Sequence, residues 1–421
     1  MEPISTSFGI RLSDVQRARY NIQGVVHPTL LAKNFRLSQQ FEANILLKRE
    51  DLQIVRSYKI RGAFNKISSL DAPQKKQGVV CASAGNHAQG VAYACQILGI
   101  HAHIFMPSTT PKQKVDQVKY FGGEWVEVVL TGDTFDDSQL EALDFCTGKG
   151  KVFVPPFDDP MVIAGQGTIG LEILEQYTQP IDYVLLPVGG GGLASGVSTV
   201  LKQLSPQTKI IGIEPHGADA MRQSIQEGKR IILHDIDTFV DGAAVKQVGE
   251  LNFNICQQHL DKVITVDEGR ICETIVDLYN KDAIVVEPSG AMCIAALHQL
   301  QAEIQGKTVV CLVSGSNNDL SRMEEIKERA LLYKGLKHYF VVVFPQRAGA
   351  LKEFVADVLG PNDDITYFQY TKKTSRESGA AVIGIELKEK RDFEPLVQRM
   401  NSLKFFGRYL NDDPNLLSIL V

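Results

Sequence analysis

A lysine stands at the start of a predicted helix in the stretch Ser57-Tyr-Lys-Ile-Arg-Gly62. Lys59 lies between an aromatic and an apolar residue, and the helix is expected from Tyr58 to Ser68. Most lysines on such a helix extend into water, so the position alone indicates no chemistry. Three further segments change this interpretation, since each follows a short apolar run: Ser83-Ala-Gly-Asn-His87, Gly189-Gly-Gly-Gly192 and Ser314-Gly-Ser-Asn317.

Together these four segments carry the groups that a pyridoxal phosphate enzyme requires. A lysine amine can bond covalently to the cofactor, the amides of a glycine loop can hold its phosphate, and polar side chains can hold its ring. All four segments stand at helix starts or at the C-terminal ends of expected strands, which is the edge of a parallel sheet where ligands bind. The sequence therefore predicts a cofactor site built around Lys59.

The glycine segment has three interpretations. Pro187–Gly196 runs from strand to loop to helix, which suits phosphate binding by amides and by the positive end of the helix dipole. A dinucleotide fingerprint would need an early strand and an acidic residue about 20 residues further on. This loop lies mid-chain, and the strand ending at Glu214 offers no clean acid for that role. A turn that binds nothing is disfavoured by the backbone entropy of four consecutive glycines.

The polar residues also have structural interpretations. Asn86 and His87 could cap the helix expected from Ala88 to Leu98, and Ser314 could be a cap or a turn residue. No partner histidine or cysteine has ligand spacing relative to His87, so no metal site is predicted there.

Composition narrows the class of protein. The chain has 421 residues, a net charge of −5 and no basic tract, which disfavours nucleic acid as a partner. The first residues lack a signal pattern and no apolar run reaches the length of a membrane span, so a cytoplasmic location is expected. The seven cysteines show no CxxC spacing, and those in apolar runs are expected to be buried reduced thiols: Cys81, Cys293 and Cys311.

The elements that must position the site alternate between strand and helix, which predicts open parallel sheets with right-handed crossovers. We expect a catalytic body over residues 1–335, with a small α/β domain of about residues 55–155 inserted in a larger one. The expected strands are Ile45–Arg49, Gly78–Ala82, His101–Met106, Glu124–Leu130, Tyr183–Val188, Ile210–Glu214, Lys262–Val266 and Thr308–Val313.

The tail has a different pattern. A linker is expected over Leu331–Lys337, followed by a separate module over residues 336–421. Its strands and helices read βαββα with a short final strand, which is typical of a ferredoxin-like α+β fold. The expected elements are a strand at His338–Phe344, a helix at Ala350–Leu359, strands at Ile365–Thr371 and Ala380–Leu387, a helix at Phe393–Leu403 and a strand near Gly407–Leu410.

Taken in order, the motifs resemble those of the threonine dehydratase family, which belongs to the fold-type II (tryptophan synthase β-like) pyridoxal phosphate enzymes. The resemblance covers roughly Gln23–Leu331, and the tail resembles a single ACT-like regulatory domain. The motifs that carry it are Ser57-Tyr-Lys-Ile-Arg-Gly-Ala63, Ser83-Ala-Gly-Asn-His-Ala-Gln-Gly90, Gly165-Gln-Gly-Thr168, Pro187-Val-Gly-Gly-Gly-Gly-Leu193 and Val313-Ser-Gly-Ser-Asn317.

The resemblance implies a role for each matched position. Lys59 would hold the cofactor covalently and remove the substrate α-proton. The phosphate would be held by Gly189, Gly190, Gly191, Gly192 and Leu193. Asn86 would contact the ring hydroxyl and Ser314 would face the pyridine nitrogen. The loop that holds the substrate carboxylate would be formed by Ser83, Gly85, Asn86 and His87.

Three positions depart from related patterns. Ala84 stands where the serine racemase branch has a second serine, which disfavours racemisation. That branch also has a cation site, whose first acidic ligand matches Glu214. Ala220 stands where a later carboxylate belongs, so no such metal is expected. Tyr58 replaces a more usual phenylalanine.

The activity implied is dehydration and deamination of L-threonine to 2-oxobutanoate and ammonia, with L-serine as a secondary substrate. The resemblance also implies a homotetramer and isoleucine as an effector of the tail. Alternatives are an L-serine dehydratase, a β-replacement enzyme such as a cysteine or cystathionine synthase, and a non-catalytic amino-acid sensor. His87 argues against β-replacement, where threonine usually follows the asparagine, and the intact Lys59 argues against the sensor.

Overall fold

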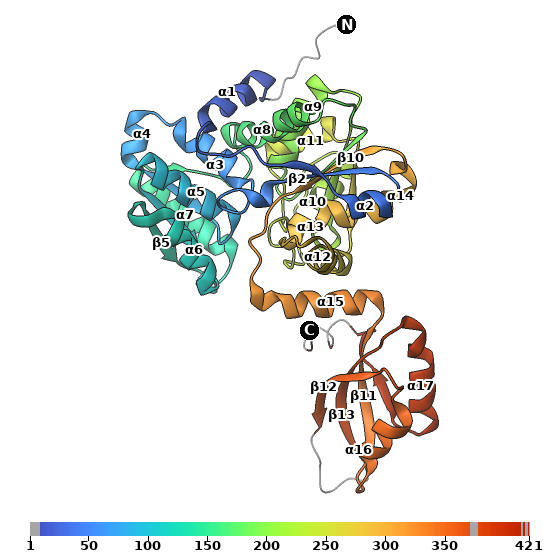
Figure 1. Ribbon diagram of the computed structural model, residues 1–421. Helices are drawn as coiled ribbons and strands as arrows, with labels where there is room; N and C mark the ends of the chain where they lie inside the picture. The colour runs from blue at the N-terminus through green and yellow to red at the C-terminus, as the bar shows by residue number, and fades with distance from the viewer. Residues whose placement is uncertain (1–8, 371–377, 414–415, 417–419, 421) are drawn as a thin grey trace. The chain divides into compact units, whose positions relative to one another are not determined.

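A computed structural model describes residues 9–370, 378–413, 416 and 420 (Figure 1). The chain forms two compact units, Met1–Asp319 and Leu320–Val421. The helices of the first unit are α1 Leu12–Ile22, α2 Phe35–Gln40, α3 Lys59–Ser68, α4 Ala72–Gln77, α5 Asn86–Leu98, α6 Lys112–Gly122, α7 Phe135–Lys149, α8 Pro160–Gln176, α9 Gly192–Leu204, α10 Ala220–Glu227, α11 Glu250–His259, α12 Glu268–Asp282, α13 Pro288–Ala295 and α14 Leu297–Ile304.

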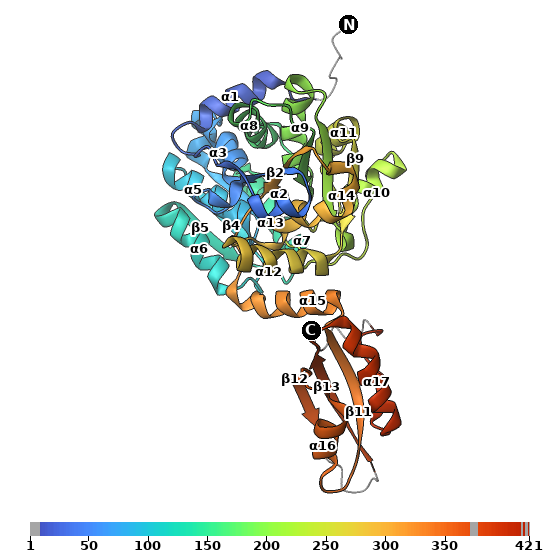
Figure 2. The same cartoon turned by 45° about the vertical axis from the view of Figure 1, so that its right-hand side comes forward.

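The larger sheet of the first unit has six strands in the order β1-β2-β10-β7-β8-β9. Only β1 runs antiparallel to its neighbour, and the others pair in parallel, as expected for a sheet that is covered on both faces. Figure 1 and Figure 2 show α8, α9 and α11 on one side of this sheet and α12 and α13 on the other. The strands are β1 Leu31–Lys33, β2 Asn44–Arg49, β7 Tyr183–Pro187, β8 Lys209–Pro215, β9 Lys262–Val266 and β10 Thr308–Val313.

The smaller sheet is fully parallel, with the order β5-β4-β3-β6. Its strands all lie between β2 and β7 along the chain, so the small α/β layer is inserted in the larger one: β3 Val79–Ala82, β4 Ala102–Met106, β5 Val126–Leu130 and β6 Val152–Phe153. This confirms the predicted fold class. The strand expected from Glu124 begins only at Val126, because a 3-10 turn over Gly123–Trp125 precedes it.

Glycines allow the helices near Lys59 to pack closely. A Cβ at Gly165 of α8 would lie 2.6 Å from the carbonyl oxygen of Arg61, and one at Gly62 would lie 2.7 Å from that of Val162. A Cβ at Gly196 of α9 would lie 2.3 Å from the carbonyl oxygen of Ile163. Since real Cβ atoms do not approach this closely, these glycines determine the spacing of α3, α8 and α9.

The second unit contains the expected ferredoxin-like module (Figure 2). Its four strands are antiparallel in the order β12-β13-β11-β14, and two helical segments pack on one face of the sheet through Phe354, Leu396 and Met400. The elements are α15 Met323–Lys334, β11 Lys337–Pro345, α16 Ala350–Glu353 with a π-helical turn at Phe354–Val358, β12 Asp364–Tyr370, β13 Ser378–Glu386, α17 Phe393–Ser402 and β14 Phe406–Tyr409.

The segment expected to be a linker, Leu331–Lys337, is instead the end of α15 and the start of β11. Gly335 ends the helix with a φ of +66°, and β11 begins two residues later. Glu328 of α15 accepts a hydrogen bond from Tyr339 and lies 3.3 Å from the amine of Lys337, so helix and strand are joined by side chains. The chain therefore divides at Asp319, and α15 belongs to the second unit. The expected strand end at Thr371 lies outside the described residues.

All seven cysteines lie in the described part of the chain, are buried and carry free thiols. None of the described helices combines the length and the apolar character needed to cross a membrane.

Candidate active site

Lys59 is the first residue of α3, and the end of β10 fixes its position. The amide of Tyr58 donates to the carbonyl oxygen of Ser314 at 3.2 Å, and Ser57 pairs with Gly315 as an isolated bridge. The amine of Lys59 donates to the carbonyl oxygen of Pro156 at 2.9 Å. Two of the predicted segments, far apart in the sequence, are thus adjacent in the fold.

The electrostatics of Lys59 suit a nucleophile. Burial of the amine lowers its pKa to about 8, and the nearby carboxylate of Glu287 opposes that shift. A neutral amine is the reactive form, so the lowered pKa raises the reactive fraction at neutral pH.

The glycine segment forms a tight loop between β7 and α9. Gly191 has a φ of +93°, which favours glycine, and a Cβ at Gly190 would lie 2.3 Å from the ring of Phe157. Asn252 holds the loop from behind, because its amide nitrogen donates at 2.9 Å to the carbonyl oxygen of Gly190. In the described part of the chain, no acceptor pairs with the amide groups from Gly189 to Leu193. The loop therefore presents free donors at the start of a helix, which suits an anion.

The loop and Lys59 share neighbours. Phe157, which a Cβ on Gly190 or Gly192 would touch, directly follows Pro156, the hydrogen-bond acceptor of Lys59. Leu193 is buried at the first turn of α9. The lysine and the anion-binding loop thus belong to one site.

Asn86 does not cap its helix. It is the first residue of α5, and Gly85 occupies the cap position. Its amide nitrogen donates to Glu287 at 2.7 Å, while its oxygen accepts a hydrogen bond from Asn317. Asn86, which follows β3 of the smaller sheet, is thereby held against Glu287 at the start of α13 and Asn317 after β10 of the larger sheet.

The remaining residues of this loop differ in accessibility. Ser83 and Gly85 are half-buried, and the amide of Gly85 donates to the hydroxyl of Ser83 at 3.2 Å. His87 is buried with its Nε2 2.8 Å from the carbonyl oxygen of Val154. Burial, followed by the charge of Lys59, lowers the pKa of His87 to about 3, so its ring is neutral at physiological pH. His87 anchors the loop to the segment after β6.

Ser314 ends β10 and is buried. Its hydroxyl donates to that of Ser289 at 3.5 Å, and Ser289 in turn donates to Glu287 at 2.7 Å. A short polar chain therefore connects the Ser314 hydroxyl to a buried carboxyl group.

Glu287 is the residue that sequence reasoning missed. It is buried just before α13 and accepts hydrogen bonds from Asn86, Ser289 and the amide of Asn317. Burial, followed by the charge of Asp241, raises its pKa to about 7. The available signal was an acidic residue at the end of the apolar run Ala283-Ile-Val-Val-Glu287, directly before a helix-starting proline.

Glu214, which matched a cation ligand, has another use in the structure. Its carboxylate accepts hydrogen bonds at 2.8 Å from the amides of Met221 and Arg222, at the start of α10. Burial raises its pKa to about 8, which disfavours the charged form. The described residues contain no cluster of three or more His, Cys, Asp or Glu suited to a metal ion.

Comparisons with known proteins bear on this geometry. Residues 22–315 match the family of pyridoxal-phosphate-dependent enzymes, and residues 328–420 match the C-terminal regulatory domain of threonine dehydratase. The chain belongs to the pyridoxal-phosphate-dependent enzymes. The predicted cofactor class and the regulatory character of the tail are both confirmed.

Individual relatives identify the branch. A biosynthetic L-threonine dehydratase of Halalkalibacterium halodurans is 56% identical over 412 residues, covering 98% of this chain and 99% of the relative. One from Bacillus subtilis is 52% identical, covering 98% of each chain. Threonine deaminase isoform 2 from Solanum lycopersicum has a TM-score of 0.72 at 43% identity, covering 77% of this chain and 95% of that one. The chain is therefore a member of the threonine dehydratases, as the order of its motifs predicted.

The residues present fit this cofactor. A loop with free amides suits a phosphate, and a lysine beside it with a lowered pKa suits an aldehyde carbon. Asn86 and Ser314 add polar groups that are both connected to Glu287, Asn86 directly and Ser314 through Ser289, so the donor set matches a phosphate-bearing aromatic aldehyde.

Glu287 allows a prediction about pH. Replacing Glu287 with glutamine should lower kcat/KM by about tenfold. The backbone amide of Asn317 donates to one carboxylate oxygen of Glu287, and this hydrogen bond is lost when an amide nitrogen replaces that oxygen. Loss of the carboxylate also removes the group that raises the pKa of Lys59, so the ascending limb of the pH profile should move to lower pH. Glu268→Gln is the control, because that carboxyl group also has a raised pKa but starts α12, with Gly217 as its partner.

Thermal unfolding provides a second measurement for the same variant. In the folded wild type the pKa of Glu287 is about 7, above the ordinary value of 4.5 for a glutamate. Glu287 therefore contributes stability that is complete below pH 4.5 and is lost as pH rises to about 7. The wild type should lose Tm relative to Glu287→Gln across this window. Parallel Tm curves and an unchanged pH profile would mean that Glu287 does not titrate near Lys59.

Proposed function

We propose that this chain catalyses the conversion of L-threonine to 2-oxobutanoate and ammonia, as the biosynthetic step that supplies isoleucine synthesis. The observation that carries the proposal is Lys59, whose amine has a pKa lowered to about 8 by burial and lies beside a loop of unpaired amides. Its relatives of more than 50% identity are described as biosynthetic L-threonine dehydratases.

Each of the matched residues has a defined role in this proposal. When bound, pyridoxal phosphate supplies an aldehyde for the amine and a ring that delocalises negative charge from the substrate Cα. The amides of Gly189, Gly190, Gly191, Gly192 and Leu193 hold the phosphate group. Asn86 holds the ring hydroxyl, and the Ser314 hydroxyl faces the pyridine nitrogen. The amine of Lys59 would hold the cofactor at its aldehyde carbon, and the same amine would act as the base for the substrate α-proton.

The loop of Ser83, Gly85, Asn86 and His87 holds the substrate carboxylate. The neutral ring of His87 cannot supply charge, so backbone amides and the Ser83 hydroxyl are the donors. Ala84 offers no acid on the opposite face of the substrate, which favours loss of the β-hydroxyl over racemisation. A hydroxyl at Ser314, unlike a carboxylate, would not stabilise a protonated ring nitrogen, which would also favour elimination over racemisation.

An assay of 2-oxo acid formation tests the activity. Purified protein with pyridoxal phosphate should release 2-oxobutanoate and ammonia from L-threonine, with a lower kcat/KM for L-serine. Formation of cysteine from an activated serine and sulfide, without 2-oxo acid from threonine, would indicate β-replacement instead.

The second unit is proposed to bind isoleucine as a feedback inhibitor. The turn between β11 and α16 contains Gly349, which has a φ of +86°. A glycine at this position has no Cβ, so a ligand could approach the backbone of the turn closely. The side-chain nitrogen of Gln346 in this turn is buried and has no hydrogen-bond partner among the described residues. An unpaired buried donor is costly, and the carboxylate of an amino acid would satisfy it.

Gln346→Leu tests this site. It should weaken inhibition by isoleucine at least about fivefold, the lower bound of typical allosteric coupling, while turnover without isoleucine stays unchanged. Gln398→Leu on α17, an exposed position, is the matched control. If calorimetry detects no isoleucine binding to the wild type and its threonine saturation curve is unaffected by millimolar isoleucine, the effector proposal is wrong.

The assembly and the location are also proposals. A homotetramer is implied by the resemblance to threonine dehydratases, and sedimentation velocity measures it. A cytoplasmic location fits an enzyme whose seven cysteines all carry free thiols.

A further inference from the structure

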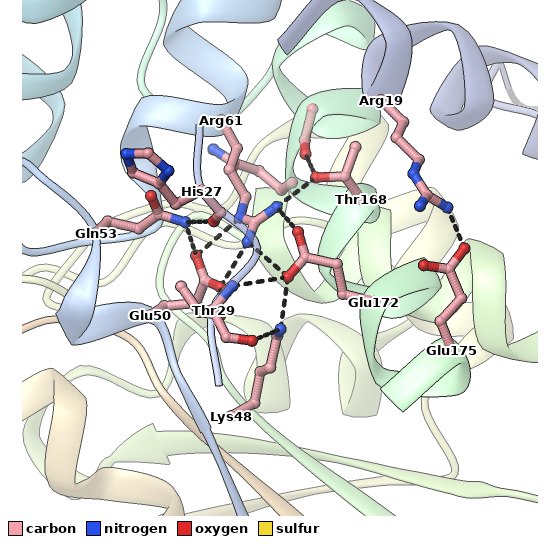
Figure 3. A network of polar contacts seen from close by, with 12 residues as sticks. Arg19, His27, Thr29, Lys48, Glu50, Gln53, Arg61, Thr168, Glu172 and Glu175 are labelled. Atoms are coloured by element: carbon pink, nitrogen blue, oxygen red, sulfur yellow. Dashed lines mark hydrogen bonds and ion pairs between the residues drawn. The ribbon is translucent and has the colours of Figure 1, made fainter. Parts of the chain in front are cut away.

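Arg61 lies two residues after Lys59 and uses every donor that it has (Figure 3). Its side chain is fully buried, and its five N–H groups all find acceptors. Two donate to the carboxylate of Glu50 at 2.8 Å each, and two donate to that of Glu172 at 2.6 and 3.0 Å. The fifth donates to the hydroxyl of Thr168 at 3.0 Å. Because the guanidinium makes a two-hydrogen-bond contact with each of two carboxylates, its orientation is fixed.

Lys48 and Thr29 complete this cluster. The buried amine of Lys48 donates to Glu172 at 2.5 Å and to the carbonyl oxygen of Thr29 at 2.8 Å. The hydroxyl of Thr29 donates to Glu50 at 2.5 Å. Two cations and two carboxylates balance, so the buried cluster is neutral as a whole.

The members of the cluster come from separate elements. Lys48 lies on β2 of the larger sheet, Glu50 directly follows that strand, and Thr168 and Glu172 lie on α8. Arg61 lies in the first turn of α3. A buried ion cluster gives little net stability in place of apolar packing, because desolvation offsets attraction, but it restricts the geometry strongly.

We infer that Arg61 is a positioning residue, which locks the first turn of α3 to β2 and α8 and so holds the amine of Lys59 at the cofactor site. The inference rests on the proposed role of Lys59. The glycine contacts between α3 and α8 allow the two helices to approach closely. Arg61 then fixes how the first turn of α3, which carries Lys59, is rotated and shifted along the helix axis. Lysine cannot replace it, since an ammonium has three donors for five acceptors.

Covalent capture of pyridoxal phosphate by the apoprotein tests this, measured by absorbance as a function of pH. Capture requires the neutral amine of Lys59. Burial lowers the pKa of this amine, and the charge of Glu287 raises it. The other titratable groups beside the amine are Tyr58 and His87, whose ring is neutral. In Arg61→Lys the loosened turn should admit water to the amine, and the midpoint of capture should rise by about one pH unit. In the holoenzyme kcat should fall about tenfold or more, with a smaller change in KM.

Two variants complete the series. Arg19→Lys alters an exposed ion pair with Glu175 on the same helix α8 and should leave both the capture midpoint and kcat unchanged. Thr168→Val removes one acceptor of Arg61 without changing charge, and should shift both quantities in the direction of Arg61→Lys by a smaller amount. Thr168→Val also decides the matter if Arg61→Lys does not fold.

The inference would be overturned if Thr168→Val and Arg61→Lys had a lower Tm but kept the wild-type capture midpoint and kcat. The cluster around Arg61 would then contribute to stability only. Failure of the underlying proposal is distinct, because then Lys59→Ala would still capture the cofactor in the same absorbance measurement. The positioning role is supported if the changes in capture midpoint and kcat increase from Arg19→Lys through Thr168→Val to Arg61→Lys.

Discussion

Lys59→Ala is expected to abolish the visible absorbance of the lysine-bound cofactor and to reduce threonine turnover by about a thousandfold or more. Alanine has neither the amine that bonds to the aldehyde nor the base that removes the α-proton, and general-base catalysis alone contributes about 10²–10⁴-fold. The visible spectrum of the purified protein and the rate of 2-oxobutanoate formation measure the two losses.

Lys76→Ala is the control for this substitution. Lys76 lies exposed on α4, away from the residues that contact Lys59, and its replacement should leave spectrum and rate as in the wild type. Turnover by Lys59→Ala near the wild-type rate would contradict the assignment of Lys59 as the reactive amine.

Gly190→Ala is expected to weaken cofactor binding by about tenfold or more. The added Cβ would lie 2.3 Å from the ring of Phe157, so either the ring or the loop must move. Movement of the loop displaces the amides that hold the phosphate, and movement of the ring disturbs Pro156, the acceptor of Lys59. Overpacking of this kind also lowers the free energy of unfolding by about 1–3 kcal/mol.

Fluorescence or absorbance titration of the apoprotein with pyridoxal phosphate measures the Kd. Gly148→Ala is the matched control, because a Cβ at that position on α7 meets no atom within 4 Å and helix propensity favours alanine by about 1 kcal/mol. Equal Kd values for Gly190→Ala and Gly148→Ala would mean that the Gly189–Gly192 loop does not hold the phosphate.

The sequence by itself determined the class of the protein. Short apolar runs alternating with helices are local signals, so the parallel sheets and the ferredoxin-like tail were predictable from residue order. The motifs around Lys59, Asn86, Gly189 and Ser314 were recognisable because each requires particular residue types at a fixed local spacing. Element boundaries shifted by a few residues, as at Asn86, where the helix starts earlier than expected.

Only the tertiary structure decided which distant residues meet. Glu287 became part of the site because its burial against Asn86 and Asn317 is a long-range contact that no local pattern encodes. The start of the second unit at α15, instead of after a linker, depends on the contacts of Glu328 with β11. The acceptors of Arg61 likewise come from elements on either side of the inserted domain. Buried charges are placed by the partners that compensate their desolvation, and those partners are brought together only when the sheets and helices pack.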